Sequence, residues 1–294
     1  MNLRFGIDLG GTKTEGVILD AEGRERLRER IATDSSGYEP VIGGIERLYR
    51  RMVGAADGAP HSLGIGTPGA VSRRTGRLKN SNTTCLNGMP VGHDLRARLG
   101  RELAIENDAN CFALAEALAG AGRGHRVVFG VIMGTGCGGG IVIDGKVHGG
   151  LQAIAGEWGH TVIDPAGPAC YCGARGCVET FISGSGLENR YAERTGSRRP
   201  VDEIVQASHA GDPAATATMD DFFARFGQAV ANLIAVLDPD VIVLGGGLSN
   251  IDELYTRGVE AVRQRVFSDS LETEIVKHRL GDSAGVIGAA LLGV

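Results

Sequence analysis

Two segments of this chain repeat one pattern, and that repeat limits the folds open to it. FGIDLGGTKTEGVILD, which starts at Phe5, aligns without gaps with FGVIMGTGCGGGIVID, which starts at Phe129. Each segment predicts an apolar strand, a glycine-rich turn and a second strand. Strands alternate elsewhere with stretches of helical spacing, such as residues 41–52, so we expect the α/β class. The repeat suggests two related lobes that face each other across a ligand cleft.

Further strands and helices can be placed along the 294 residues. A strand is expected to break at Pro68-Gly69, and a short strand is expected to run into a helix near residue 108. We also expect a long helix over residues 214–237, an apolar strand ending in three glycines near residue 245, and a closing helix over residues 284–293. The length suits one large domain or two of ordinary size.

Net charge and composition limit which binding partners and which cellular compartment we expect for this protein. The formal net charge of −5 argues against nucleic acid or an anionic membrane as the main partner. The first residues carry no signal-peptide pattern, and no apolar stretch reaches the roughly 20 residues that span a bilayer. We therefore expect a cytoplasmic protein whose six cysteines stay reduced.

The first glycine turn offers groups suited to a phosphate and its cation. It carries Asp8, Gly10, Gly11, Thr12 and Lys13. Its glycines let backbone N–H groups approach an anion, and the carboxylate could hold a hydrated Mg²⁺. The Walker A spacing is absent, and an ordinary hairpin turn is the alternative.

The second turn repeats this arrangement in the other half of the chain. It consists of Gly134, Thr135 and Gly136, and the two turns together suggest a polyphosphate held between the lobes. The letters here contain GxGxxG, but they lead into β-branched residues and not a helix, which argues against a nicotinamide site.

A third glycine cluster follows an apolar strand. Gly245, Gly246 and Gly247 lie at the carboxyl end of that strand, where ligands bind in open α/β sheets. We expect a flat ligand to lie against this backbone, with a purely structural turn as the alternative.

Polar acceptors gather in three short motifs. Asn107 and Asp108 stand where a strand meets a helix, Glu157 and His160 lie in GEWGH, and Glu179 follows a cysteine cluster. Asp108 fits two roles: an N-cap, or a general base that takes a proton from an alcohol. Together the five side chains suit a ligand covered in hydroxyl groups.

The stretch from residue 160 to residue 177 predicts a metal site. His160, Cys170, Cys172 and Cys177 form a Cys₃His set, and the C-x-C-x₄-C spacing is not a redox C-x-x-C. Four protein ligands suit a closed, structural Zn²⁺ site, with unmetallated thiols as the alternative. We expect His160 to hold the metal through one ring nitrogen and to face the ligand with the other.

These motifs resemble one family over nearly the whole chain, the ROK sugar kinases of the actin-like ATPase superfamily. GIDLGGTKTE, GIGTPG, NDANC, GTGCGGGIVIDG, GEWGH, CYCGARGCVE and DPDVIVLGGGLSN fall in the family's order. The narrower likeness is to bacterial fructokinases of manno(fructo)kinase type, carried by KNSNTTCLNGMPV, CYCG and ETFISGSG. N-acetylglucosamine kinases are the nearest competitor.

The resemblance implies a fold and a set of roles. It implies a two-lobed actin-like (ribonuclease H-like) fold, with one lobe over 1–109 plus 282–294 and a larger lobe over 110–281. It also implies transfer of the γ-phosphoryl group of ATP, with Mg²⁺, to a hexose hydroxyl, with Asp108 as base and a structural zinc. Asn107, Glu157, His160 and Glu179 match the sugar-holding residues, and Gly69 and Asn82 join them. The three glycine clusters match the ATP-binding segments, and a homodimer is expected.

One residue departs from the fructokinase pattern and leaves the identity of the sugar substrate open. Similar fructokinases carry Trp where this chain has Cys85, so glucose, mannose and N-acetylglucosamine stand beside fructose as substrates. A sugar-responsive repressor of the same family is the alternative from another class. The phosphate turn begins at Asp8, close to the first residue of this sequence, so we expect no DNA-binding segment before it.

Overall fold

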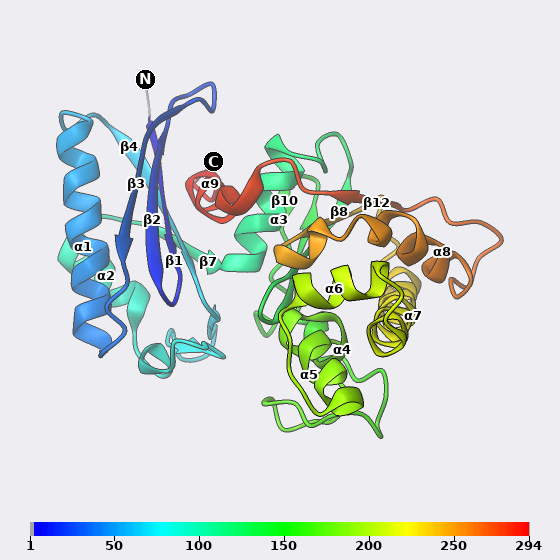
Figure 1. Ribbon diagram of the computed structural model, residues 1–294. Helices are drawn as coiled ribbons and strands as arrows, with labels where there is room; N and C mark the ends of the chain where they lie inside the picture. Colours follow the sequence, from blue (N-terminus) through cyan, green and yellow to red (C-terminus); the bar gives the residue numbers. More distant parts are fainter. Residues whose placement is uncertain (1–2, 294) are drawn as a thin grey trace. The chain divides into compact units, whose positions relative to one another are not determined.

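The protein is described here by a computed structural model covering residues 3–293 (Figure 1). The strands are β1 (Leu3–Leu9), β2 (Lys13–Leu19), β3 (Glu25–Ala32), β4 (His61–Thr67), β5 (Ala70–Val71), β6 (Leu78–Lys79), β7 (Ala104–Asn107), β8 (Val127–Met133), β9 (Cys137–Ile143), β10 (Lys146–Val147), β11 (Val241–Gly245) and β12 (Glu274–Lys277). The α-helices are α1 (Tyr38–Ala55), α2 (Val91–Leu99), α3 (Asp108–Ala119), α4 (Glu179–Ile182), α5 (Gly184–Thr195), α6 (Val201–His209), α7 (Pro213–Leu237), α8 (Arg257–Arg263) and α9 (Ala284–Leu291). The 3₁₀ helices are η1 (Thr84–Leu86), η2 (Trp158–His160), η3 (Gly247–Asn250), η4 (Asp252–Tyr255) and η5 (Gly281–Ser283).

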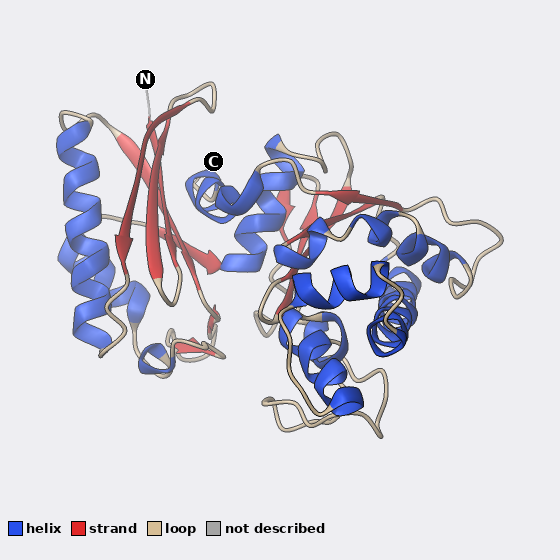
Figure 2. Ribbon diagram, viewed as in Figure 1, coloured by secondary structure: helices blue, strands red, loops and turns tan. Residues whose placement is uncertain are grey.

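Two mixed five-stranded sheets follow the same plan (Figure 2). The first has the order β3-β2-β1-β4-β7, and the second has the order β10-β9-β8-β11-β12. In each sheet an antiparallel hairpin, β1–β2 or β8–β9, is followed by parallel strands. The sequence repeat therefore corresponds to these two hairpins, and the predicted α/β class is confirmed.

The contacts within the chain define two compact units. Unit 1 comprises residues 1–120, 146–155 and 280–294, and unit 2 comprises residues 121–145 and 156–279. The smaller lobe expected over 1–109 plus 282–294 and the larger lobe expected over 110–281 stay a prediction. No helix within residues 3–293 is long and apolar enough to cross a membrane.

Unit 1 buries both faces of its sheet. Helix α1 turns Ile42, Ile45, Leu48 and Met52 toward one face, where they pack with residues of β1 and β4. Helix α9 covers the opposite face, where Val286 and Ala290 meet Val17 and Leu19 (Figure 1). The expected helix over residues 41–52 is thus part of α1.

Glycines let α9 approach its neighbours backbone to backbone. A Cβ atom on Gly64 of β4 would lie 1.9 Å from the carbonyl oxygen of Ala289 in α9. One on Gly288 would lie 1.8 Å from the carbonyl oxygen of Cys111 in α3. This packing fixes α3, whose first turn carries Asp108.

Unit 2 has its own core, built from the second sheet and the long helix α7. Phe222, Phe226 and Val230 of α7 are buried with Phe129 and Val131 of β8. Helix α7 begins after Asp212, whose Oδ1 accepts the N–H of Ala215 at 2.8 Å. This core supports the ends of β8, β9 and β11, where the glycine turns lie.

Candidate active site

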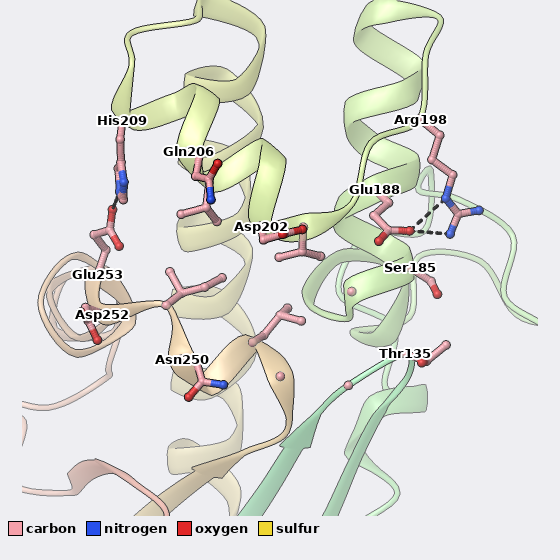
Figure 3. Close-up of a pocket in the computed structure, with 17 residues that line it drawn as sticks. Thr135, Ser185, Glu188, Arg198, Asp202, Gln206, His209, Asn250, Asp252 and Glu253 are labelled. Carbon is pink, nitrogen blue, oxygen red and sulfur yellow. Dashed lines mark hydrogen bonds and ion pairs between the residues drawn. The ribbon is translucent and has the colours of Figure 1, made fainter. Parts of the chain in front are cut away.

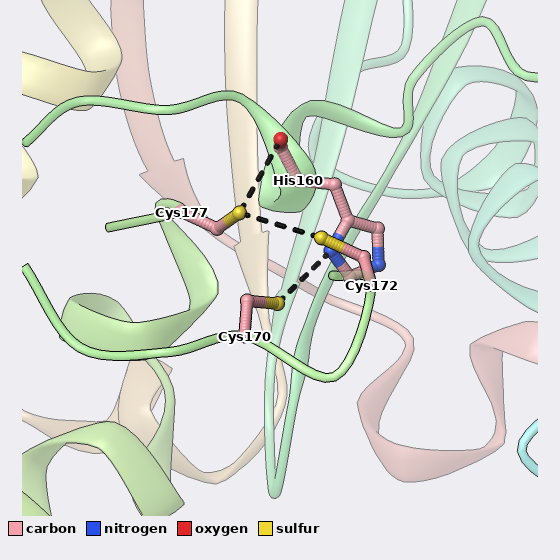
Figure 4. A group of neighbouring side chains, drawn as sticks. All are labelled: His160, Cys170, Cys172 and Cys177. Atoms are coloured by element: carbon pink, nitrogen blue, oxygen red, sulfur yellow. Dashed lines mark hydrogen bonds between the residues drawn. The ribbon is translucent and has the colours of Figure 1, made fainter. Parts of the chain in front are cut away.

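The predicted metal ligands come together in unit 2 (Figure 4). His160 ends η2, and the three cysteines lie in the loop that follows. One ligand atom from each of His160, Cys170, Cys172 and Cys177 lies within 4.8 Å of all the others. Nδ1 of His160 is 3.6 Å from Sγ of Cys170, and the Sγ atoms of Cys172 and Cys177 are also 3.6 Å apart.

These separations suit a tetrahedral ion. With Zn–S bonds of about 2.3 Å and a Zn–N bond of about 2.0 Å, the ligand atoms of a tetrahedral site are expected about 3.5 to 3.8 Å apart. Backbone bonds pre-form the loop, since the N–H of Cys170 donates to the Ala174 oxygen at 2.9 Å and Val162 bridges Cys177. The set fits Zn²⁺ with no ligand position left for substrate, which makes a structural role the chemical expectation.

The thiols of the cluster differ in their electrostatic surroundings. A hydrogen bond from the backbone of Ala174 lowers the pKa of Cys172, which favours its thiolate. Burial raises the pKa of Cys177 to about 12. A bound dication would reverse that second shift, because metal binding to cysteine expels the thiol proton.

Glu179 connects this loop to the second glycine turn. Its Oε2 accepts the N–H of Cys137, the first residue of β9, at 2.9 Å. A Cβ atom on Gly136 would lie 2.6 Å from the same oxygen. The turn is also tied to α5, because the N–H of Gly184 donates to the Gly134 oxygen at 2.8 Å. The carboxylate, the turn and the metal loop are therefore one packed assembly within unit 2.

A cavity of about 780 Å³ opens beside this turn, wholly within unit 2 (Figure 3). Gly134 and Thr135 form one wall, the segment from Gly247 to Glu253 a second, and α5 and α6 the rest. Its apolar lining residues are Val201, Val205, Leu248 and Ile251.

Ion pairs stand at both ends of α6 beside this cavity. Arg198, just before α6, donates to Glu188 of α5 at 2.7 Å, and His209 at the end of α6 pairs with Glu253 (Figure 3). The cavity, with its apolar lining residues and the glycine turn beside it, suits a flat base with phosphates attached.

The third glycine cluster borders the same cavity. Gly246 has φ +79°, and a Cβ atom there would lie 2.5 Å from the carbonyl oxygen of Met133 at the end of β8. Gly247 lines the cavity directly, whereas Gly245 is the last, buried residue of β11. The second and third glycine clusters, far apart in sequence, are thus brought together.

Unit 1 carries the predicted base. Asn107, and not Asp108, caps α3: its Oδ1 accepts the N–H groups of Ala109 and Asn110 at 2.9 and 3.4 Å. Its Nδ2 donates to Oδ1 of Asp108 at 2.9 Å, and the N–H of Ala109 donates to the same oxygen at 2.9 Å. Asn107 therefore takes the capping role. Asp108, at the first turn of the helix, accepts hydrogen bonds from two donors.

Asp8 lies at the carboxyl end of β1, in the neighbourhood of Asp108. Burial raises the pKa of Asp8, and the nearby carboxylates of Asp108 and Glu15 raise it further. The Lys13 ammonium opposes them, and the resulting pKa is about 7. Cβ atoms on Gly66 or Gly285 would lie 3.0 Å from its oxygens, so the carboxylate is enclosed by backbone. Like charges held this close together are relieved by a cation.

The other predicted residues of unit 1 lie on turns. Gly10, Gly11, Thr12 and Lys13 form the β1–β2 turn, where Gly11, Thr12 and Lys13 are exposed. Gly69 has φ +83°, and its carbonyl oxygen accepts Nδ2 of Asn107 at 3.4 Å. Asn82 is exposed in the segment between β6 and η1.

Two sets of residues beside the predicted sites carry no motif that marks them in the sequence. Helix α6 lines the cavity with Asp202, Gln206 and His209, yet no glycine or motif marks it. The hydroxyl of Tyr171 lies 3.0 Å from Nε2 of His160, the nitrogen expected to face a ligand. In the sequence, the signal that could have marked Tyr171 is its position between two predicted metal ligands, Cys170 and Cys172.

Comparison with known proteins identifies the family. The sequence profile of the ROK family matches residues 4–293, so the chain belongs to that family. It is a sugar kinase, a phosphotransferase with an alcohol acceptor, in the two-domain actin-like ATPase fold. The N-acetyl-D-glucosamine kinase of Pasteurella multocida (strain Pm70) is 38% identical to it, over 99% of both chains.

Two further proteins illustrate the range of relatives. The N-acetylgalactosamine kinase AgaK of Shewanella sp. (strain ANA-3) is 37% identical, over 98% of this chain and 96% of its own. The crystal structure of the ROK hexokinase from Thermus thermophilus superposes with a TM-score of 0.90 at 32% identity, covering 99% of this chain and 97% of that one. These relatives favour the N-acetylglucosamine kinase alternative over the fructokinase that the narrower likeness suggested.

Proposed function

We propose that this protein transfers the γ-phosphoryl group of ATP to a hydroxyl group of an N-acetylhexosamine, with N-acetylglucosamine as the first candidate. The observation that carries the choice is the likeness, over almost the full length, to a kinase of that sugar. Fructose, mannose and glucose are the second candidates, since the segments around Cys85 and Tyr171 resemble fructokinases.

The proposed chemistry is assigned residue by residue. Asp108 accepts the proton of the attacking hydroxyl, and the donors on its Oδ1 fix its direction. Asn107, Gly69 and Asn82 in unit 1, and Glu157, His160 and Glu179 in unit 2, hold the sugar. Positioning and charge stabilisation supply most of the rate in such transfers.

The nucleotide is assigned to the glycine clusters. Its base occupies the cavity between α6 and Gly247, and Gly134, Thr135 and Gly136 approach its phosphates. Gly10, Gly11, Thr12 and Lys13 are proposed as the phosphate turn of unit 1, and Asp8 as the carboxylate that holds Mg²⁺ through water. Zn²⁺ on the cysteine loop would neutralise its thiolates and fix His160.

A panel of sugars tests the proposal. ADP release with Mg-ATP is measured for N-acetylglucosamine, N-acetylgalactosamine, N-acetylmannosamine, glucose, mannose and fructose. We expect the highest kcat/KM for an acetamido sugar. A preference for fructose of about tenfold or more would overturn the proposed substrate while leaving the kinase assignment intact.

We also propose a homodimer, as the family resemblance implies. Light scattering on the purified protein should give twice the mass of one chain. A mass equal to one chain at micromolar concentration would contradict this.

A further inference from the structure

One face of helix α7 contacts the segment that precedes the metal loop, residues 170–177. Nη2 of Arg225 donates to Oδ2 of Asp164 at 2.9 Å. Three residues further along the helix, Nε2 of Gln228 donates to the carbonyl oxygen of Ile163, also at 2.9 Å. The long helix of the unit 2 core therefore binds two consecutive residues of this segment.

Asp164 organises the base of the metal loop with its side chain and its backbone. Its Oδ1 accepts the N–H of Ala166 at 3.1 Å, and its carbonyl oxygen accepts the N–H of Gly167 at 2.8 Å. Gly176 belongs to the far end of the loop, and a Cβ atom there would lie 1.6 Å from the same carbonyl oxygen. The two ends of the loop therefore meet at Asp164, the residue that Arg225 holds.

Arg225 also covers Phe181, which lies two residues past Glu179 in α4. The centre of the guanidinium is 4.6 Å from the ring centroid, and the phenylalanine is only 2% exposed. A Cβ atom on Gly167 would lie 2.7 Å from Cζ of the same ring, so the ring also packs against the base of the loop. A cation over a partly desolvated aromatic face binds more strongly than one in water.

The ion pairs of Arg225 are suited to fixing direction as well as distance. The side chains of Arg225 and Asp164 are 24% and 28% exposed. Asp221 lies 3.5 Å from Nε of Arg225, and its other oxygen accepts from Arg190 of α5 at 3.2 Å. A planar guanidinium that meets several charged partners has less freedom than a single ammonium would have.

We propose that Arg225 is a positioning residue of the sugar site. Through Asp164 it fixes the segment that follows His160. Through Phe181 it fixes α4, whose first residue is Glu179. The inference rests on the proposed function, in which His160 and Glu179 hold the sugar. The metal would join the cysteines and His160 to one another, whereas Arg225 ties the loop to α7.

Arg225→Met tests this role, because it removes the guanidinium and keeps an apolar side chain near Phe181. The Kd and KM for sugar, from calorimetry and steady-state kinetics, should rise about 3- to 30-fold because the sugar-holding residues are less well placed. The kcat and the KM for ATP should stay within about twofold, as expected when ground-state binding is lost. Hydrogen exchange in residues 161–178, measured without sugar, should become faster. An unchanged Kd for sugar would overturn the proposal.

Arg257→Met is the matched control within unit 2. It also removes a guanidinium that lies over a buried ring, 4.5 Å from the centroid of Phe223, and that pairs with a carboxylate of α7, Asp220. Both of these partners lie on α7, away from the metal loop in sequence. The control should leave the Kd for sugar and the exchange of residues 161–178 unchanged. Equal effects of the two variants on sugar binding would show that Arg225 acts only through general stability.

Two further variants keep the test decisive if Arg225→Met folds poorly. Arg225→Lys keeps the charge without the planar fork, so its Kd for sugar should lie between those of the wild type and Arg225→Met. Asp164→Asn should also raise the Kd. The double variant should then show less than the sum of the two single effects on binding free energy, because both changes break one contact. Fully additive effects would contradict action through Asp164.

The measurements separate this inference from the proposed function. A wild type that binds and phosphorylates a sugar, together with an unaffected Arg225→Met variant, defeats only the role of Arg225. A wild type that binds no sugar defeats the proposed function and the positioning of a sugar site with it. In that case the exchange of residues 161–178 still decides whether Arg225 holds the loop.

Discussion

At the scale of single residues, Asn107 and Asp108 lie at the start of the same helix, α3, and have different roles there. Asn107 accepts the N–H groups of Ala109 and Asn110 at the start of α3, and Asp108 also accepts the N–H of Ala109. Asn107 also donates to Asp108, so the same amide caps the helix and orients the base.

The first prediction concerns this base. Asp108→Asn should reduce kcat by about 10²- to 10⁴-fold, because the amide cannot accept the hydroxyl proton. The Kd for sugar should change little, since an amide still forms hydrogen bonds. Steady-state kinetics and calorimetry measure the two quantities. Turnover close to that of the wild type would contradict the assignment.

The second prediction concerns the proton on Asp8. With a pKa of about 7 against an ordinary value of 3.8, the folded protein keeps this proton at pH 6.5. Its contribution to stability is fully present below pH 3.8 and is lost as the pH rises through about 7. Binding of Mg-ATP should ionise Asp8 and release up to about one proton at pH 6.5.

Calorimetry in buffers of different ionisation enthalpy measures that release. The dependence on buffer should vanish at pH 8.5, where Asp8 is already ionised, and in Asp8→Asn at any pH. An equal release from the wild type and from Asp8→Asn would show that another group supplies the proton.

At the scale of elements, the loop from Cys170 to Cys177 has little regular structure. Its backbone bonds run to Ala174 and across to Val162, and it adds few apolar side chains to the core. A metal is therefore the main candidate for the group that rigidifies it, and Glu179 of α4 lies two residues past it.

The third prediction tests the metal. The purified wild type should contain about one zinc per chain. Cys172→Ala should lose most of that zinc, lower the unfolding temperature and raise the KM for sugar, because the loop also carries His160. Cys85→Ala is the control for zinc content, since Cys85 lies outside the cluster. A metal-free, stable and active Cys172→Ala protein would rule out the structural role.

The fourth prediction concerns the contact between β4 and α9. Gly64→Ala should destabilise the protein by about 1 to 3 kcal/mol, because its Cβ meets the Ala289 oxygen and neither backbone can yield cheaply. Gly54→Ala in α1 is the control: nothing lies within 4 Å of its Cβ, so stability should stay the same or rise. Urea unfolding gives both values, and equal midpoints for the two variants would contradict the packing argument.

At the scale of the whole molecule, each unit has its own apolar core. Units of this kind can respond separately to a ligand that touches only one of them. The cavity lined by α6 and Gly247 lies entirely within unit 2.

The fifth prediction uses adenosine, which has no phosphates. It should slow hydrogen exchange in the segments around Gly134, Gly184 and Gly247 of unit 2, and should leave the β1–β2 turn unchanged. Mg-ATP should protect that turn as well, because the proposed phosphate contacts lie there. Protection of the β1–β2 turn by adenosine alone would contradict the assignment of the base to unit 2.

The sequence by itself determined the class, the repeat and the grouping of His160 with three cysteines. Strand period, glycine turns and the C-x-C-x₄-C spacing are local patterns, and the hairpins β1–β2 and β8–β9 and the Cys₃His cluster follow from them. Only the tertiary structure decided that Asn107 caps α3, that α6 lines the cavity and that Tyr171 meets the outer nitrogen of His160. Those facts depend on contacts between side chains whose partners local patterns cannot specify, because packing of the cores brings them together.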